Sequence, residues 1–350
     1  MIDRFLRSTC VQMTAYCLLL TVVMGCKPPS AVRPGSDVSL NDARVVFIGP
    51  SSDDSQWQGI VGGAKRYLRE YTMLQVEYTA SAQFHATDFL DTVGTIAATS
   101  PRVIALYHRD REILTQAART ARDAHVRVIT IGDRTDVQGL FGHVEEDIGG
   151  AAELLGLHLD QIAGDRKSYF LLHCQSKGRR GKYFYRQFID KARDYHALTL
   201  LKEGDACDGK QTADALIRAL FTEFPNAGFV VTLDSVIDQE GMMDALHARP
   251  APFATVGAAP ALWPDLRSGK ALALAGVNDG ELGAAAAELV VAALTDSRQP
   301  GAFKLVESEL ITAETLPDFV QRYTAATGLQ PEEGQAQPTS APSSQAIETP

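Results

Sequence analysis

The densest run of basic side chains lies between residues 174 and 186, in the segment CQSKGRRGKYFYR. Four of six consecutive residues are positively charged: Lys177, Arg179, Arg180 and Lys182. The run follows an apolar segment and precedes a helical pattern, and backbone donors at the start of a helix favour anions. It is not a Walker phosphate loop, because Gly178 and Gly181 are too close together and no Ser or Thr follows the last lysine. Two interpretations stay open, a site for an anionic group and a solvated basic turn.

The sequence lacks the usual signatures of an enzyme or a metal centre. It contains no Gly-x-Ser-x-Gly elbow, no His-Glu-x-x-His pattern, no paired spacing of metal ligands and no Gly-x-Gly-x-x-Gly after a strand-like run. The eight histidines are scattered, so we expect His108, His143 and His173 to be structural rather than catalytic. The sequence therefore predicts no catalytic residues, no metal and no cofactor.

Short apolar runs alternate with helical patterns, which is typical of parallel sheets buried on both faces. The runs in the first half are ARVVFIGP (43–50), LQVEYT (74–79), RVIALY (102–107) and VRVITIG (126–132). After a break, the second half has SYFLLHC (168–174), ALTLLKE (197–203), GFVVTL (228–233) and PFATVG (252–257). The last elements, ALALAGV (271–277), an Ala-rich helix and FKLVESELIT (303–312), are too few for a third domain. We expect them to complete two similar α/β domains.

The first 25 residues have the pattern of an export signal. Arg4 and Arg7 precede an uncharged, mainly apolar run from about Val11 to Met24. A transmembrane anchor is the alternative, but it needs about 20 apolar residues, and this run has roughly 14. The sequence VMGC at 23–26 resembles the lipobox of bacterial lipoproteins. By this resemblance Cys26 becomes the first mature residue and carries the lipid that attaches the protein to a membrane.

Composition limits the partners of the chain. Residues 26–42 and 328–350 are poor in large apolar groups, so we expect a disordered tether and a disordered tail. The formal charge of the whole chain is −10, and removal of Asp3, Arg4 and Arg7 with the signal takes away a net +1 and leaves −11. A chain of this charge is a poor nucleic-acid binder.

Export also limits how the cysteines can pair. Cys10 and Cys17 would leave with the signal and Cys26 would be lipidated, so Cys174 and Cys207 remain in the folded part. Two cysteines in an oxidising compartment suggest one disulfide, with two separate buried thiols as the alternative.

Four segments resemble, in order and spacing, the type I periplasmic sugar-binding proteins of the ribose-binding kind. They are VVFIGPSSDDSQWQGIVGGAK (45–65), VRVITIGDRTD (126–136), HVEEDIGGAAELLGLHL (143–159) and FVVTLDSVIDQEGMMDAL (229–246). The resemblance implies two three-layer α/β/α lobes with parallel sheets, joined by a crossing-strand hinge. The lobes would comprise 43–144 with 278–303, and 145–277 with 304–320. Repressors of the lac type share this fold, but they carry a helix-turn-helix where this chain has the lipobox-like sequence.

The resemblance places a ligand between the lobes, beyond the carboxyl ends of the strands. Carboxylates there accept pairs of sugar hydroxyls, and an aromatic face covers the C–H side of a sugar. The ligand-binding candidates are Asp54, Gln56, Trp57, Tyr107, His108, Asp133, Arg134, Arg180, Lys182, Asp234 and Asn278. Alternatives stay open: a helix N-cap for Asp54, a core position for Trp57, and a surface ion pair for Asp133 with Arg134.

Three departures from the family pattern argue against a plain pentose as the ligand. Leu233 precedes Asp234 where relatives commonly have Asn-Asp, and Ala258 and Ala259 stand where relatives have an aspartate. Near the last crossover, Asn278 is the closest amide to a glutamine that is common in relatives. If the basic run at 177–182 contributes to the site, the expected ligand is an acidic or phosphorylated sugar.

The resemblance implies an exported, lipid-anchored solute-binding protein that closes on a small polar ligand, expected to be a sugar, and delivers it to an ABC-type importer. The alternative is a sensory receptor subunit that signals to a membrane histidine kinase. The expected partners are the ligand, an ABC permease or a sensor kinase, and the membrane through the lipid anchor. We expect the protein itself to be a monomer.

The strand order of such a lobe also bears on the disulfide. It makes SYFLLHC and ALTLLKE neighbouring parallel strands, so Cys174 and Cys207 lie at adjacent tips. A bridge is expected if their Cα atoms are within about 7 Å.

Overall fold

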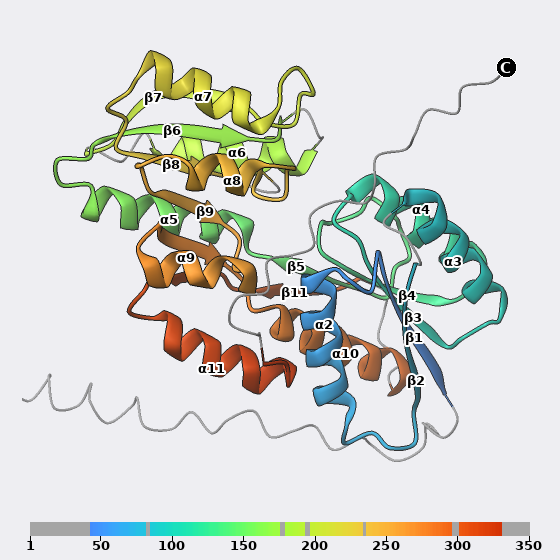
Figure 1. The fold of residues 1–350 in the computed structure, drawn as a ribbon. Helices are drawn as coiled ribbons and strands as arrows, with labels where there is room; N and C mark the ends of the chain where they lie inside the picture. Colours follow the sequence, from blue (N-terminus) through green and yellow to red (C-terminus); the bar gives the residue numbers. More distant parts are fainter. Residues whose placement is uncertain are drawn as a thin grey trace, which may run out of the picture. The chain divides into compact units, whose positions relative to one another are not determined.

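The computed structural model describes residues 43–330 apart from 82–84, 176–178, 193–196, 234–235 and 296–300. Within these ranges, two six-stranded sheets are each covered by helices on both faces (Figure 1). No helix in these ranges is both long enough and apolar enough to cross a bilayer. The expected signal, the Cys26 motif, the tether and most of the tail lie outside the described residues.

The first sheet has the strand order β11-β5-β4-β3-β1-β2, with every pairing parallel. Its strands are β1 (Arg44–Gly49), β2 (Gln75–Ala80), β3 (Val103–Tyr107), β4 (Arg127–Ile131), β5 (Gly142–Glu146) and β11 (Ala302–Val306). Successive side chains of a strand point to opposite faces. Val45 and Phe47 therefore pack under α2 (Ser55–Leu68) and α10 (Asp279–Thr295), whereas Val46 and Ile48 pack under α3 (Ala86–Ala98) and α4 (Arg111–Asp123).

The second sheet has the order β12-β10-β9-β8-β6-β7 and is parallel except for β12, which pairs with β10 in the antiparallel direction. Its strands are β6 (Ser168–His173), β7 (Thr199–Asp205), β8 (Phe229–Thr232), β9 (Phe253–Val256), β10 (Ala271–Gly276) and β12 (Glu309–Ile311). Helices α5 (Ile148–Ile162) and α6 (Arg179–Ala192) cover one face. The other face carries α7 (Ala213–Glu223), α8 (Met242–His247), α9 (Trp263–Ser268) and α11 (Leu316–Thr327). The two-lobed α/β fold expected from the sequence is confirmed.

The chain passes between the sheets three times within the described residues: after β5, after β10 and after β11. The last crossing divides the segment 303–312 between the sheets, because β11 pairs with β5 as far as Val306 and β12 pairs with β10 from Glu309. The lobe boundary expected after residue 303 lies within β11, and the bound expected at residue 320 lies within α11, which extends to Thr327.

Helices α2 and α10 approach each other backbone to backbone because glycines line their contact. A Cβ atom at Gly63 of α2 would overlap the carbonyl group of Gly280, and one at Gly283 of α10 would overlap the carbonyl group of Ile60. Gly59 lies in the same way against the Cβ of Asp279. This contact brings the N-terminal ends of α2 and α10 together beside the first sheet.

Cys174, directly after β6, and Cys207, just past β7, form a disulfide with a Cα–Cα distance of 4.9 Å. Strands β6 and β7 are parallel neighbours, with His173 opposite Asp205 at their carboxyl ends. The bridge therefore joins the two loops that leave adjacent strand tips.

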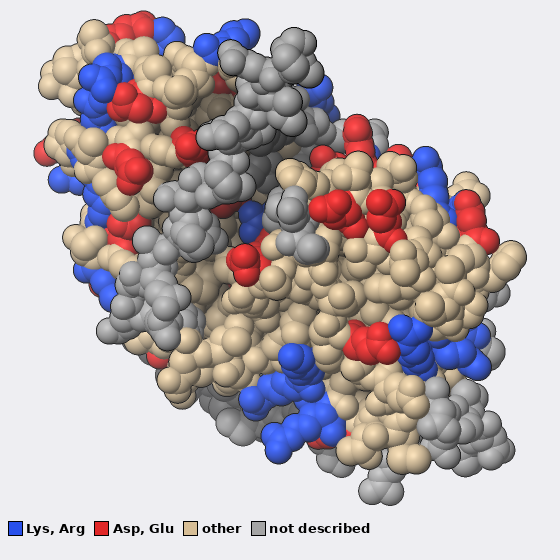
Figure 2. Space-filling model, turned by 45° about the vertical axis from the view of Figure 1, so that its right-hand side comes forward, with Lys and Arg blue, Asp and Glu red and all other residues tan. Residues whose placement is uncertain are grey.

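The surface carries charges of both signs. On the face shown in Figure 2, basic and acidic side chains are spread among uncharged ones, and the described residues form no continuous basic stripe there. This distribution agrees with the net charge of −10.

The glycine contact between α2 and α10 predicts a position-specific effect of a single methyl group. Gly283→Ala should lower the free energy of unfolding by about 1–3 kcal/mol, because the added Cβ has no space beside the carbonyl of Ile60. Gly94→Ala, within α3, is the matched control: its Cβ would meet nothing closer than 3.9 Å. That change should raise stability by about 0.5–1 kcal/mol. Urea unfolding followed by circular dichroism measures both, and equal effects of the two variants would contradict the packing described.

Candidate functional site

The carboxyl ends of β1 and β3 lie at the point where the strand order of the first sheet reverses. Strand β1 pairs with β2 on one side and with β3 on the other. The loops that leave β1 and β3 therefore separate toward opposite faces, and such a switch point is where open α/β sheets bind ligands. Asp54 and Gln56 follow β1, while Tyr107 and Arg109 end and follow β3.

Asp54 is the N-cap of α2, and its Oδ1 accepts a hydrogen bond from the backbone N–H of Trp57 at 2.9 Å. The residue is 7 % exposed. The same Oδ1 lies 3.4 Å from Nη2 of Arg109. Oδ2 is buried and has no hydrogen-bond partner among the described residues. Asp54 thus combines the N-cap role with a carboxylate oxygen that is open to another donor.

Gln56 uses both ends of its amide within the protein. Its Oε1 accepts from the hydroxyl of Tyr107 at 2.6 Å, and its Nε2 donates to Oε1 of Glu146 at 3.0 Å. The sequence predicted Gln56 as a ligand contact. In the structure its amide connects Tyr107 at the end of β3 to Glu146 at the end of β5, and the ligand contact stays a prediction.

Trp57 and Tyr107 lie in the core of the first lobe. The indole is 4 % exposed and packs so closely on the end of β1 that a Cβ atom at Gly49 would overlap it. The ring of Tyr107 is parallel to it, with centroids 6.2 Å apart. Burial and the nearby charge of Asp54 raise the pKa of Tyr107 well above its ordinary value, so its hydroxyl stays protonated. The core position considered for Trp57 is therefore the one observed.

Sequence reasoning missed Arg109, although it directly follows the predicted pair Tyr107 and His108. Its guanidinium contacts Asp54 through Nη2 and Oδ2 of Asp238 through Nη1, the latter at 2.7 Å. Asp238 lies in the turn between β8 and α8, so this ion pair joins the first lobe to the second. Burial opposes the charge of Arg109, but Tyr107, Asp54 and Asp238 together raise the pKa of its guanidinium.

Sequence reasoning also missed Asp279, the first residue of α10, which directly follows the predicted Asn278. Burial, Glu146 and Asp54 raise the pKa of the Asp279 carboxyl well above its usual range, against the opposing effects of Arg109 and a hydrogen bond from Gln56. Asp54, Glu146 and Asp279 therefore form an acidic cluster with Gln56 and Arg109 among them. A signal was present in the sequence, because an acid at the start of a helix next to a crossover is well placed to face a ligand.

Asn278 has the role of a helix cap and keeps one free donor group. Its Oδ1 accepts from the backbone N–H of Gly280 at 3.0 Å, and its carbonyl accepts from the N–H groups of Glu281 and Leu282. The residue is 1 % exposed, and its Nδ2 has no partner among the described residues.

His108 and Arg134 have contacts outside this cluster. His108 is buried and accepts from the backbone N–H of Asp110 through Nδ1 at 2.9 Å, while its ring lies against Phe89. Burial lowers the pKa of His108, which favours a neutral structural ring. Arg134 is exposed, with its guanidinium 5.9 Å from the ring centre of Phe303 on β11. Asp133, directly before it, is buried.

Several predicted residues cannot be joined to the cluster. Lys182 is an exposed residue of α6. Asp234, Cys26 and the side chain of Arg180 lie outside the described residues. Among the described residues no group of three or more His, Cys, Asp or Glu has an arrangement suited to a metal ion.

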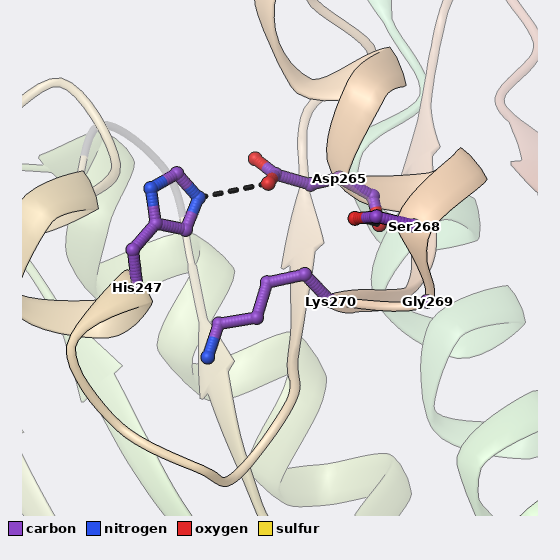
Figure 3. Close-up of a pocket in the computed structure, with 5 residues that line it drawn as sticks. All are labelled: His247, Asp265, Ser268, Gly269 and Lys270. Atoms are coloured by element: carbon purple, nitrogen blue, oxygen red, sulfur yellow. Dashed lines mark hydrogen bonds and ion pairs between the residues drawn. The ribbon is translucent and has the colours of Figure 1, made fainter.

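A surface cavity of about 490 Å³ lies elsewhere, lined by His247, Asp265, Ser268, Gly269 and Lys270. Figure 3 shows His247 directed at Asp265, with Nε2 and Oδ1 2.8 Å apart. Lys270 donates to the backbone carbonyl of Arg249 and directly precedes β10. The cavity thus lies at the amino end of a parallel strand, opposite to the edge that carries the acidic cluster, and its charged groups already contact one another or the backbone.

Residues 45–298 match the family model of the periplasmic binding protein domain. GanP, a glucose-galactose binding protein from Geobacillus stearothermophilus, is 16 % identical, with a TM-score of 0.66 over 79 % of this chain and 99 % of its own. A solute binding protein of an ABC transporter from Bacillus halodurans, with bound myo-inositol, is 15 % identical, with a TM-score of 0.66 over 83 % and 100 %.

A periplasmic ribose ABC transporter protein from Conexibacter woesei is 17 % identical, with a TM-score of 0.67 over 82 % and 97 % of the two chains. No curated protein sequence matches this chain. At such identities, the likeness to the solved structures establishes the fold and leaves the ligand to be argued from the site.

The surroundings of His143 on β5 predict an acid-sensitive stability. Burial, then the nearby charge of Arg134, lowers the pKa of His143 from 6.5 to about 4, against the smaller opposing effect of a hydrogen bond with Thr130. Between pH 6.5 and 4 the unfolded chain binds more protons at this site, so the free energy of unfolding should fall as the pH falls, by up to about 3 kcal/mol.

Chemical denaturation between pH 7 and pH 4 measures this effect. His143→Asn should flatten the pH dependence, because the variant has no titrating ring but keeps a polar group near Thr130, which bonds Nδ1. His125→Asn, at an exposed position with φ 61° that Asn tolerates, is the control and should keep the slope. An unchanged slope in His143→Asn would show that other groups carry the dependence.

Proposed function

Since the chain belongs to the periplasmic binding protein family, we propose that it binds a small polyhydroxylated molecule, a sugar or sugar derivative, at the carboxyl ends of β1 and β3. The observation that carries this proposal is the buried carboxylate of Asp54, whose Oδ2 has no partner among the described residues. A hydroxyl group is a donor that a carboxylate oxygen can accept.

The surrounding groups suit a ligand with several hydroxyls. Asn278 holds a free Nδ2 donor, Arg109 holds a buried Nε without a partner among the described residues, and Glu146 and Asp279 supply further carboxyl groups. The site thus contains both donors and acceptors, and a sugar hydroxyl can pair with either. The proteins of similar fold include a glucose-galactose binding protein, a solute binding protein with bound myo-inositol and a periplasmic ribose ABC transporter, which supports the same class of ligand for this chain.

We further propose that the protein acts outside the cytoplasm, held by a lipid on Cys26, and delivers its ligand to an ABC permease. The support is the family membership, the export pattern of residues 1–25 and the lipobox-like VMGC sequence. A subunit that signals to a membrane histidine kinase would use the same binding event. We assign no catalytic step to the site.

A panel of sugars tests the binding proposal. Thermal unfolding of the protein with neutral, acidic and phosphorylated sugars should give a clear stabilisation by at least one, since a ligand at 100 times its Kd adds about 2.7 kcal/mol. Calorimetry with a neutral sugar and its anionic derivative then tests whether the basic run at 177–182 binds an anionic group of the ligand. Equal affinities for the two would contradict that role. The absence of any binding across the panel would contradict the proposed function.

Asp54→Asn tests the residue that carries the proposal. Asparagine is also a good N-cap, so α2 should keep its stability while the site loses its charge. The affinity for the sugar found in the panel should fall about 10- to 100-fold, as expected for the loss of a hydrogen bond to a charged group. Asp110→Asn is the matched control, because Asp110 caps α4 in the same way through Glu112 and Ile113. Equal losses in both variants would place the ligand elsewhere.

Cys26→Ser tests the lipid anchor. Wild-type protein expressed with its first 25 residues should incorporate a labelled fatty acid and sediment with membranes, whereas the variant should do neither, because serine offers no thiol for the lipid. Labelling of the variant, or an unlabelled wild-type protein, would contradict lipid attachment at this residue.

A further inference from the structure

Arg109 is the residue through which the acidic cluster of the first lobe contacts the second lobe. Its Nη2 lies 3.4 Å from Oδ1 of Asp54, and its Nη1 donates to Oδ2 of Asp238 at 2.7 Å. Asp54 begins α2 after β1, and Asp238 follows β8 of the other sheet. One guanidinium therefore connects the carboxyl end of a strand in each lobe.

The two ends of this bridge differ in exposure. The side chain of Asp54 is fully enclosed, that of Arg109 is 33 % exposed and that of Asp238 is 41 % exposed. A buried carboxylate needs a compensating cation, so Arg109 is held near Asp54 by the cost of leaving that charge unpaired. The Asp238 carboxylate is in contact with water, which can replace the guanidinium as its partner. The contact with Asp238 can therefore form and break while Arg109 stays beside Asp54.

The buried end of the bridge is incompletely hydrogen-bonded. Oδ2 of Asp54 and Nε of Arg109 are both buried, and neither has a partner among the described residues. The carboxylate oxygen of Asp54 needs a donor and the Nε–H of Arg109 needs an acceptor, and a hydroxyl group can be both at once. Such a hydroxyl would satisfy the two atoms together and would restrict the guanidinium to the orientation in which Nη1 reaches Asp238.

We propose that Arg109 and Asp238 form a ligand-coupled bridge between the lobes, in which a ligand hydroxyl binds between Asp54 Oδ2 and Arg109 Nε and thereby favours the Arg109–Asp238 ion pair. The ligand part rests on the proposed function, whereas the bridge itself does not. Arg109 is then a ligand-contact residue, and Asp238 is a positioning residue that acts through it. Because coupling between two equilibria is reciprocal, the ion pair raises ligand affinity by the same factor by which the ligand stabilises the ion pair.

Asp238→Asn tests the bridge without any ligand. The substitution removes one charge at a partly exposed position and leaves the buried end intact. Small-angle X-ray scattering of the protein alone should give a larger radius of gyration for Asp238→Asn than for wild type, and Asp238→Glu, which keeps the charge, should restore the wild-type value. Asp214→Asn is the matched control, since it breaks surface pairs with Arg218 and Arg249 that lie within the same lobe as Asp238, and it should leave the radius of gyration unchanged.

Calorimetry with the sugar found in the panel tests the coupling. Asp238→Asn should weaken binding at least about fivefold, the lower end of typical coupling between sites, while Asp238→Glu and Asp214→Asn should not. In a double-mutant cycle, Asp238→Asn should cost nothing further once Arg109→Gln is present, because the bridge is then already broken.

Each outcome decides a separate point. An unchanged radius of gyration in Asp238→Asn would overturn the bridge, and this result needs no ligand. A larger radius with unchanged affinity would overturn the coupling, as would independent losses in the double-mutant cycle. If no sugar binds the wild-type protein, the proposed function and the coupling are both overturned, while the scattering result still decides the bridge.

Discussion

The contact of α2 with α10 through their glycine backbones is the constraint on which the candidate site depends. The facing backbones leave no room for a Cβ atom at Gly63, opposite Gly280, or at Gly283, opposite Ile60, so the close approach of the two helices requires glycine at these positions. That close approach brings Asp54 and Gln56, at the start of α2, next to Asp279, at the start of α10. The chain enters α10 directly after β10 of the second sheet, so the same contact fixes a segment that has just crossed between the lobes.

The acidic side chains brought together in this way repel one another when charged, and the other residues of the cluster reduce that repulsion. Asp54 is buried against Arg109, the carboxyl of Asp279 is driven toward its neutral form, and Gln56 orients Glu146 while accepting from Tyr107. A buried polar network stabilises a structure only when its members are satisfied. Three buried atoms, on Asp54, Arg109 and Asn278, have no hydrogen-bond partner among the described residues, and a ligand hydroxyl is a group that can pair with each kind.

Sequence reasoning predicted ligand contacts at the ends of β1 and β3, and these contacts stay predictions. Asp54 was chosen because it follows the first apolar run, and it belongs to the acidic cluster, whereas Tyr107, at the end of the third run, is a core residue that donates to Gln56. Gln56 was expected to contact ligand, yet its amide is used by Tyr107 and Glu146, partners 51 and 90 residues away in the chain. Arg109 and Asp279 were missed although each is adjacent to a predicted residue, because a local pattern cannot tell which neighbour in a loop faces the cluster.

The sequence by itself determined the alternation of strands and helices, and with it the two-lobed α/β class, because hydrophobic periodicity is a local property of the chain. It also predicts an export signal before the fold and a polar tail after it, and both stay predictions. Only the tertiary structure decided that 303–312 divides between two sheets, that Trp57 packs on Gly49, and that Arg109 reaches Asp238. These outcomes depend on contacts between residues far apart in the chain, where packing and the pairing of buried charges select one arrangement among several that are locally equivalent.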